Sequence, residues 1–203
     1  MKKLIATSLV MAAASGLLFA ADTAAAPETE AQFIQRTYLA PHHSKIDANM
    51  VLSLRDWYGI PPLWTLTIAG AESSVGDPKL GGRLVGFNNF FCIRFGDHTT
   101  KWGSLSVDNT PLHKPLPAVT VGGRKWFQFP SAWSGMVAWG RLIKVGPACA
   151  PGYYMDCIRK NDLESFAEMY YGRDVPGFAA YLDNVHRIWN SFQGKANAAG
   201  YDW

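Results

Sequence analysis

An apolar run that ends in a single carboxylate is the feature that most constrains this chain. The run extends from Ile60 to Ala71 (IPPLWTLTIAGA), opens with Pro61-Pro62 and is followed at once by Glu72. Proline is tolerated in the first turn of a helix, so the run predicts an apolar helix that begins at this pair and carries Glu72. A carboxyl group on such a helix loses part of its hydration, which raises its pKa toward the range where it donates a proton near neutrality. Glu72 is therefore the candidate general acid.

Two short motifs follow from the end of this run. Residues 72–76 read ESSVG, and residues 88–94 read NNFFCIR. Together they resemble the E-S-x-x-G and N-N-L-F-G-I-K motifs of the glucosaminidase family of peptidoglycan hydrolases (autolysins and flagellar muralytic domains), within the lysozyme-like superfamily. The resemblance implies an α+β, mainly α, lysozyme-like domain with a small β-hairpin element across a cleft from the catalytic helix.

The resemblance also implies a reaction, hydrolysis of the β-1,4 bond after N-acetylglucosamine by an endo-β-N-acetylglucosaminidase, a glycoside hydrolase. That reaction needs a proton for the departing oxygen, which Glu72 would supply, and stabilisation of an oxocarbenium-like centre. A second carboxylate or the substrate's own acetamido group can provide the stabilisation. Two alternatives stay open: a muramidase or lytic transglycosylase, which also uses a single Glu, and a catalytically silent wall-binding module of the same fold.

The sequence departs from the family pattern at the second carboxylate. Many members place a Glu in the hairpin, whereas residues 97–130 contain no Glu, and Asp97 and Asp108 are the carboxylates left there. Asp108 is the candidate, with a role as a turn residue as the alternative. Because Asp reaches one methylene less far than Glu, we expect Asp108 to matter less than Glu72.

A third motif supplies a tyrosine. Residues 170–178 read YYGRDVPGF, which resembles the family's Y-x-x-D-x-x-Y. In this register Tyr171 and Asp174 match, and Phe178, one position beyond the second Tyr of the pattern, replaces it. The resemblance implies that Tyr171 orients the acetamido group or the attacking water.

Four more residues are candidates for contact with the sugar. Asn88 and Asn89 suit a sugar acetamido group or the backbone of their own loop, and in the alternative interpretation they only cap turns. Phe91 and Trp102 are the aromatic candidates for lining the sugar groove, with packing in the core as the alternative.

The first residues have the composition of a secretory signal peptide. Lys2 and Lys3 precede an apolar run over residues 4–20 and an Ala-rich stretch to Ala26. We expect a leader over residues 1–25, cleaved between 20 and 26, with an uncleaved anchor as the alternative. The protein would then be secreted, periplasmic or associated with the cell wall, with no membrane span after cleavage. One domain over 28–195 and a tail over 196–203 complete the expected organisation.

The charge of the chain does not suggest a polyanionic partner. The net charge is +3, and it falls to about +2 without the leader, with no basic stripe that would favour nucleic acid. We therefore expect peptidoglycan glycan strands as the partner, and a monomer. His42-His43 has no further ligand at metal-binding spacing, so neither a metal nor another cofactor is expected.

Three cysteines in an exported chain leave one over if two of them pair. Cys149 and Cys157 bracket a short segment, and a local disulfide between them is the expected pair. Cys92 occupies the position where the family motif has Gly, and we expect a buried, inert thiol there.

The remaining elements follow from helical spacing, caps and turn residues. Before the apolar run we expect a first helix over 28–38 and a second that follows an N-cap at Ser44 and ends at Gly59. Within 97–130 we expect a β-hairpin or small sheet with turns at Asp108-Asn109 and Gly122-Gly123. After it we expect a helix from Ser131 to Gly146, a helix that opens with a capping box of Asn161 and Glu164 and runs through Tyr171, and a last amphipathic helix from Pro176.

Overall fold

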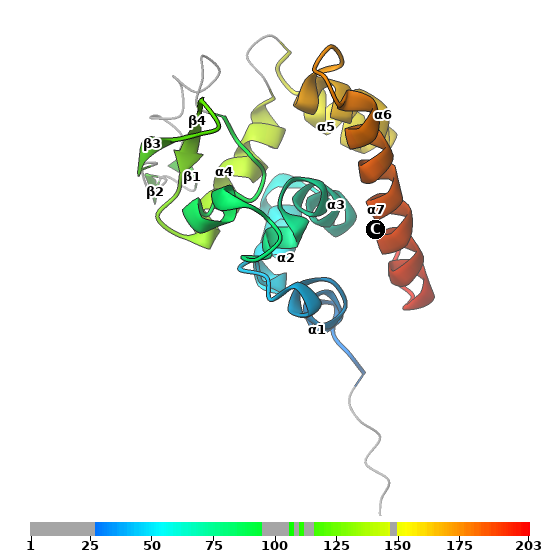
Figure 1. Ribbon diagram of the computed structural model, residues 1–203. Coiled ribbons are helices and arrows are strands. Elements are labelled where there is room, and N and C mark those ends of the chain that lie inside the picture. The colour runs from blue at the N-terminus through cyan, green and yellow to red at the C-terminus, as the bar shows by residue number, and fades with distance from the viewer. Residues whose placement is uncertain (1–26, 95–105, 108–109, 112–115, 147–149) are drawn as a thin grey trace, which may run out of the picture.

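The computed structural model describes residues 27–94, 106–107, 110–111, 116–146 and 150–203 (Figure 1). The expected leader, Trp102, Asp108 and Cys149 lie outside these residues. The helices are α1 (Glu30–Ile34), α2 (Ala48–Tyr58), α3 (Pro62–Ser73), α4 (Ala132–Val145), α5 (Tyr153–Lys160), α6 (Leu163–Ala167) and α7 (Phe178–Ala198). The strands are β1 (Ser106–Val107), β2 (Thr110–Pro111), β3 (Leu116–Val121) and β4 (Arg124–Gln128). The α+β, mainly α, architecture is as predicted.

Short helical turns extend several of these helices. π-helical turns follow α1 and α6, at Gln35–Leu39 and Glu168–Gly172. Turns of 3-10 helix lie at Ala40–His42, Ser74–Gly76 and Arg83–Phe87. The second and third of these bracket the loop that follows α3.

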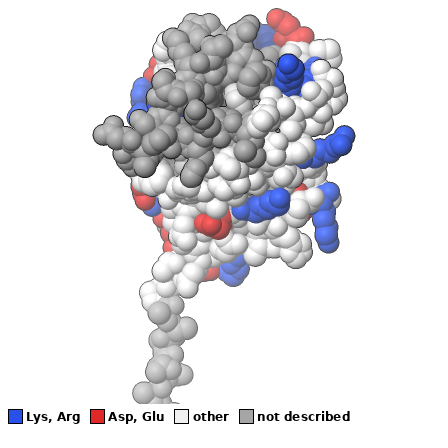
Figure 2. Space-filling view, turned by 90° about the vertical axis from the view of Figure 1, so that its left-hand side faces the viewer, with Lys and Arg blue, Asp and Glu red and all other residues white. Residues whose placement is uncertain are grey.

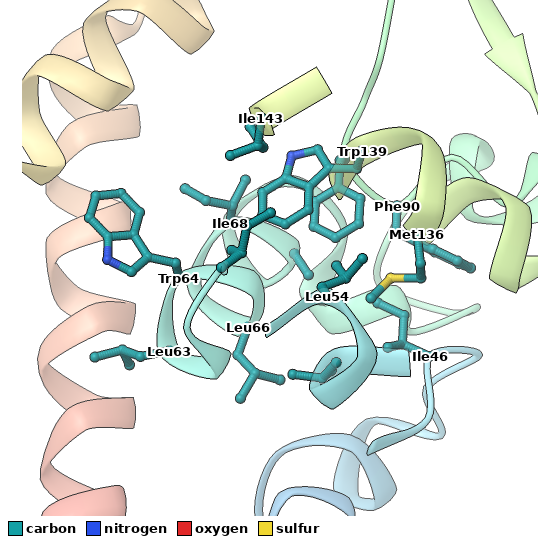
Figure 3. Packing of buried hydrophobic residues seen from close by; sticks show 14 of the residues in the cluster. Ile46, Leu54, Leu63, Trp64, Leu66, Ile68, Phe90, Met136, Trp139 and Ile143 are labelled. Atoms are coloured by element: carbon teal, nitrogen blue, oxygen red, sulfur yellow. The ribbon is translucent and has the colours of Figure 1, made fainter. Parts of the chain in front are cut away.

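Helix α3 is the central element, packed against α7 and α2 (Figure 1). Leu63 to Ala69 are all buried, so the apolar run predicted the most enclosed helix of the fold. Trp64 points toward α7, where its ring meets that of Trp189 at 5.1 Å between centroids (Figure 3). Gly70 permits the close approach of the two helices, because a Cβ there would lie 3.1 Å from Cγ2 of Ile188.

Helix α4 packs against α2 and carries the largest fully buried side chain, Trp139. A Cβ at Gly140 would lie 2.6 Å from Cδ2 of Tyr58, so a glycine is needed where the two helices meet. Figure 3 shows Met136 of the same helix close to Ile46, just before α2. Helix α4 thus closes the core opposite α7. It begins at Ser131 as predicted, and Ser131 is its N-cap.

Strands β3 and β4 form the predicted antiparallel hairpin, in which Val119 pairs with Trp126. Its turn residues Gly122 and Gly123 have φ of +58° and +73°, the left-handed values that a two-residue hairpin turn requires. An isolated bridge between Arg94 and Trp126 and a hydrogen bond from Phe127 N to Ile93 O (3.2 Å) join β4 to the NNFFCIR segment. The hairpin is therefore fixed to the segment that follows the acid-bearing helix.

Two predicted helix starts were wrong by a few residues. Helix α2 is capped by Asp47, because the hydroxyl of Ser44 instead donates to Val75 O at 2.5 Å. Helix α6 is capped by Asp162, whereas Asn161 ends α5, a helix that was not predicted.

The C-terminal residues are packed against the start of the fold. Helix α7 continues to Ala198, into the stretch expected to be a tail. The ring of Tyr201 stacks on Phe33 at 4.8 Å between centroids, and Trp203 Nε1 donates to Glu30 Oε1 at 2.8 Å. The chain end therefore contributes to the aromatic cluster beside α1.

Figure 2 shows Lys and Arg side chains scattered over the face on the hairpin side, with a few Asp and Glu among them. Within the described part of the chain, no helix is long and apolar enough to cross a membrane.

Candidate active site

Glu72 lies in the last turn of α3, partly exposed where α3, α7 and the NNFFCIR segment meet. Its carboxylate Oε1 accepts a hydrogen bond of 2.8 Å from the hydroxyl of Tyr181 on α7. The donor comes from 109 residues further along the chain. The packing of α3 on α7 therefore sets the surroundings of this carboxyl group.

Burial raises the pKa of Glu72 above its ordinary value. The hydrogen bond from Tyr181, the nearby thiol of Cys92 and the positive charge of Arg94 lower the pKa in part, and burial has the larger effect. The partial negative charge at the C-terminal end of a helix acts in the same direction as burial. These surroundings favour the protonated form of the carboxyl group.

The ESSVG motif builds the turn that leaves α3. The hydroxyl of Ser73 donates to Ala69 O and accepts from Gly76 N, both at 3.0 Å, which ties the helix end to the following turn. Ser74 and Val75 both have left-handed φ, of +51° and +54°. The turn is thus tightly determined directly beside the acid.

The side chains of Asn88 and Asn89 form hydrogen bonds with backbone groups, which is one of the two roles that the sequence suggested. Nδ2 of Asn89 donates to Ile93 O (2.9 Å) and Phe127 O (3.0 Å), and its Oδ1 accepts from Ile93 N (2.8 Å). Nδ2 of Asn88 donates to Phe129 O at 3.0 Å. Asn89 is buried, so its predicted contact with substrate is not available, whereas Asn88 is partly exposed and its contact stays a prediction.

Phe91 was also predicted to bind substrate, and the structure corrects this. Its side chain is 1% exposed and stacks on Trp139 with centroids 4.1 Å apart and planes at 9°. Its carbonyl oxygen accepts a 2.6 Å hydrogen bond from the hydroxyl of Tyr170. Phe91 anchors the segment in the core rather than lining a groove.

Cys92 follows Phe91 in the chain and contacts the backbone of Glu72. Its Sγ donates to Glu72 O at 3.4 Å, and its φ of +50° is left-handed. Burial and the neighbouring charge of Glu72 raise the pKa of the thiol, which makes it a poor nucleophile. Cys92 is a free thiol, as predicted, although it is only partly buried.

The predicted disulfide is not formed in the structure, because Cys157 is a free, buried thiol on α5. Its predicted partner, Cys149, lies outside the described residues. Burial and the charge of Asp162 raise the pKa of Cys157.

The tyrosine that reaches the acid is Tyr181, which sequence reasoning missed. Tyr171, the predicted one, stacks on Tyr181 with centroids 4.4 Å apart, and its hydroxyl donates to Pro176 O at 3.4 Å. A signal was present, since Tyr181 lies four residues before Val185 and seven before Ile188 on the buried stripe of α7. A catalytic role for Tyr171 stays a prediction.

The structure does not place every predicted site residue. Trp102 and Asp108 lie outside the described residues, so their roles stay predictions. Among the residues that are described, no group of three or more His, Cys, Asp or Glu is arranged to hold a metal ion.

A comparison with protein-family models finds no match for this chain, and a comparison with curated proteins finds none either. Among solved structures, the crystal structure of the catalytic domain of the autolysin Auto from Listeria monocytogenes is similar to it. The two share 17% identity with a TM-score of 0.45, over 88% of this chain and 92% of that chain. At this identity and TM-score the likeness supports no inference about function.

Proposed function

We propose that this chain is an exported peptidoglycan hydrolase of lysozyme-like fold that cleaves the β-1,4 bond after N-acetylglucosamine. The observation that carries the proposal is the carboxyl of Glu72, a half-buried residue, whose pKa is raised by burial and which accepts a hydrogen bond from Tyr181 at 2.8 Å. The resemblance of ESSVG and NNFFCIR to the glucosaminidase motifs supports the choice of substrate. Secretion, or retention in the periplasm or at the cell wall, is part of the proposal and follows from the expected leader.

Glu72 acts first as a general acid. Its proton passes to the glycosidic oxygen as the bond from that oxygen to the anomeric carbon breaks. The carboxylate left behind keeps the hydrogen bond from Tyr181, which stabilises the charge that has just formed. Tyr181 thereby adjusts the strength of the acid.

The electron-poor anomeric carbon then takes up an oxygen. The acetamido oxygen of the same sugar or a water molecule attacks it, and a water that completes the reaction returns a proton to Glu72. We propose Asp108 as an auxiliary carboxylate and Tyr171 as the aromatic beside Tyr181 that orients the acetamido group. Asn88 and Trp102 remain the proposed contacts to the sugar.

The test compares Glu72→Gln with Glu164→Gln, an exposed glutamate on α6, on soluble peptidoglycan. We expect Glu72→Gln to abolish release of fragments while circular dichroism stays unchanged, and Glu164→Gln to behave as the wild type. Mass spectrometry of the fragments identifies the new end.

The new end separates the proposal from its alternatives. A reducing N-acetylglucosamine supports it, whereas a reducing or 1,6-anhydro muramic end indicates a muramidase or a lytic transglycosylase. Half of the wild-type rate in Glu72→Gln would exclude this residue as the acid. No release by the wild type, with retained binding to cell wall, would indicate a silent wall-binding module.

A further inference from the structure

Arg94 places a positive charge near Glu72. It follows Cys92 by two residues and is exposed, and its backbone pairs with that of Trp126 on β4. The guanidinium carbon lies 5.5 Å from the centroid of the Trp126 ring. That ring is itself held, because Trp126 Nε1 donates to Val121 O at 3.1 Å.

The N–H donors of the Arg94 guanidinium are available. In the described part of the chain none of them hydrogen-bonds to another residue, and an arginine carries five such donors in one plane. Within the described part of the chain, no carboxylate lies within 4.0 Å of the Arg94 guanidinium to form a salt bridge. By contrast, Arg55, Arg36 and Arg173 each pair with a glutamate.

The positive charge of Arg94 also acts on Glu72, because it lowers the pKa of that carboxyl against the larger effect of burial. Glu72 does not neutralise it, because the carboxylate is engaged by Tyr181 instead. A carboxylate bound at Arg94 would therefore lie near the bond that Glu72 cleaves.

We propose that Arg94, whose guanidinium lies over the ring of Trp126, binds a carboxylate of the substrate and makes the site prefer acidic glycan strands to neutral polymers of N-acetylglucosamine. A planar guanidinium with free edges forms two parallel hydrogen bonds with a carboxylate, which a lysine cannot reproduce. In peptidoglycan this group is the lactyl carboxylate of a peptide-free muramic residue or a carboxylate of the stem peptide. The inference rests on the proposed function, because it names the feature of the substrate read at the same site.

The experiment measures a ratio of specificities. For each variant, kcat/KM is measured on peptide-bearing glycan strands, on peptide-free strands and on a chitin oligosaccharide, which has no carboxylate. We expect Arg94→Gln to lower the ratio of acidic to neutral substrate about tenfold, as loss of a charge-assisted pair implies. Arg94→Lys should lower the ratio by a smaller factor, and Arg124→Gln, at the exposed hairpin turn, should leave it unchanged.

The outcomes decide the source of the carboxylate as well. A loss on peptide-free strands identifies the lactyl group, and a loss confined to peptide-bearing strands identifies the stem peptide. An unchanged ratio in Arg94→Gln, or an equal change in Arg124→Gln, would overturn the proposal.

Binding of the same three glycans is measured in parallel by calorimetry, at low and at high salt. If the wild type cleaved none of them but bound the acidic strands about tenfold more tightly than Arg94→Gln, the hydrolase proposal would fail and the role of Arg94 would stand. If neither binding nor cleavage depended on Arg94, the inference would fail whatever the activity of Glu72.

Discussion

Replacing Tyr181 by Phe removes one oxygen atom and tests the central contact of the site. The ring can keep its stack on Tyr171, 4.4 Å between centroids, so the change is confined to the 2.8 Å hydrogen bond to Glu72. Burial and the charge of Glu72 raise the pKa of Tyr181, so the hydroxyl remains a donor throughout the working range of pH.

The size of the effect follows from what the hydrogen bond stabilises. A hydrogen bond to a charged group contributes about 1.5–3 kcal/mol. The ionised form of Glu72 receives this stabilisation, and the transition state of proton transfer shares part of it. We therefore expect the rate to fall about tenfold or somewhat more, since 1.4 kcal/mol corresponds to about a factor of ten.

The direction of the pKa shift in Tyr181→Phe can be read from the pH dependence of the rate. The Tyr181 hydrogen bond lowers the pKa of Glu72 against the larger effect of burial, so its loss raises that pKa further. The alkaline limb of the rate profile, where Glu72 loses its proton, should move to higher pH in Tyr181→Phe. The assay is kcat/KM on soluble peptidoglycan from acid to alkaline pH.

Tyr171→Phe is the matched comparison, because the Tyr171 hydroxyl donates to Pro176 O at 3.4 Å and not to Glu72. If Tyr171 orients the acetamido group, its loss should lower the rate but leave the alkaline limb unmoved, since the pKa of Glu72 does not depend on this hydroxyl. An unmoved limb in Tyr181→Phe, or a shift of the limb in Tyr171→Phe instead, would refute the assignment of Tyr181.

Two stability predictions follow from the same geometry. Glu72→Gln should raise the free energy of unfolding by on the order of 1 kcal/mol at pH 8. The pKa of Glu72 is higher in the folded than in the unfolded protein, so the wild type is most stable below the unfolded pKa and loses stability as the pH rises through the folded pKa. Urea unfolding should therefore show the difference in free energy of unfolding between Glu72→Gln and the wild type disappearing toward pH 4. A difference that stays constant with pH would contradict this. Asn89→Ala should cost about 2–4 kcal/mol, because it leaves buried groups of Ile93 and Phe127 unpaired, and Asn88→Ala about 1 kcal/mol. Equal losses in urea unfolding would show that Asn89 has no special role.

Several predictions that rested on local sequence signals were confirmed. Pro61-Pro62 and the apolar run marked the start and the burial of α3, and Gly122-Gly123 marked the hairpin turn. Both depend on backbone preferences that neighbouring residues determine. The same holds for the start of α4 at Ser131.

Long-range contacts account for most of the differences. Nothing near Ser44 indicates that its hydroxyl bonds to Val75 O rather than capping α2. The sequence allows Phe91 to face either the sugar or the core. It faces the core because its ring stacks on Trp139, which lies 48 positions further along the chain. Helix α5 was missed although Tyr154, Met155, Cys157 and Ile158 are buried along one side, because the segment was interpreted as a disulfide-closed loop.

Cys92 shows how one substitution within a family-like motif fits the site. The motif that this segment resembles has Gly at this position, whereas Cys92 here has a φ of +50°, and left-handed backbone costs a non-glycine residue about 1–2 kcal/mol. The cysteine offsets part of this cost through its thiol, which donates to Glu72 O at 3.4 Å. That oxygen is one of the carbonyls at the end of α3 that have no partner within the helix. The thiol therefore secures the helix end that carries the acid, while its raised pKa keeps it protonated as a donor.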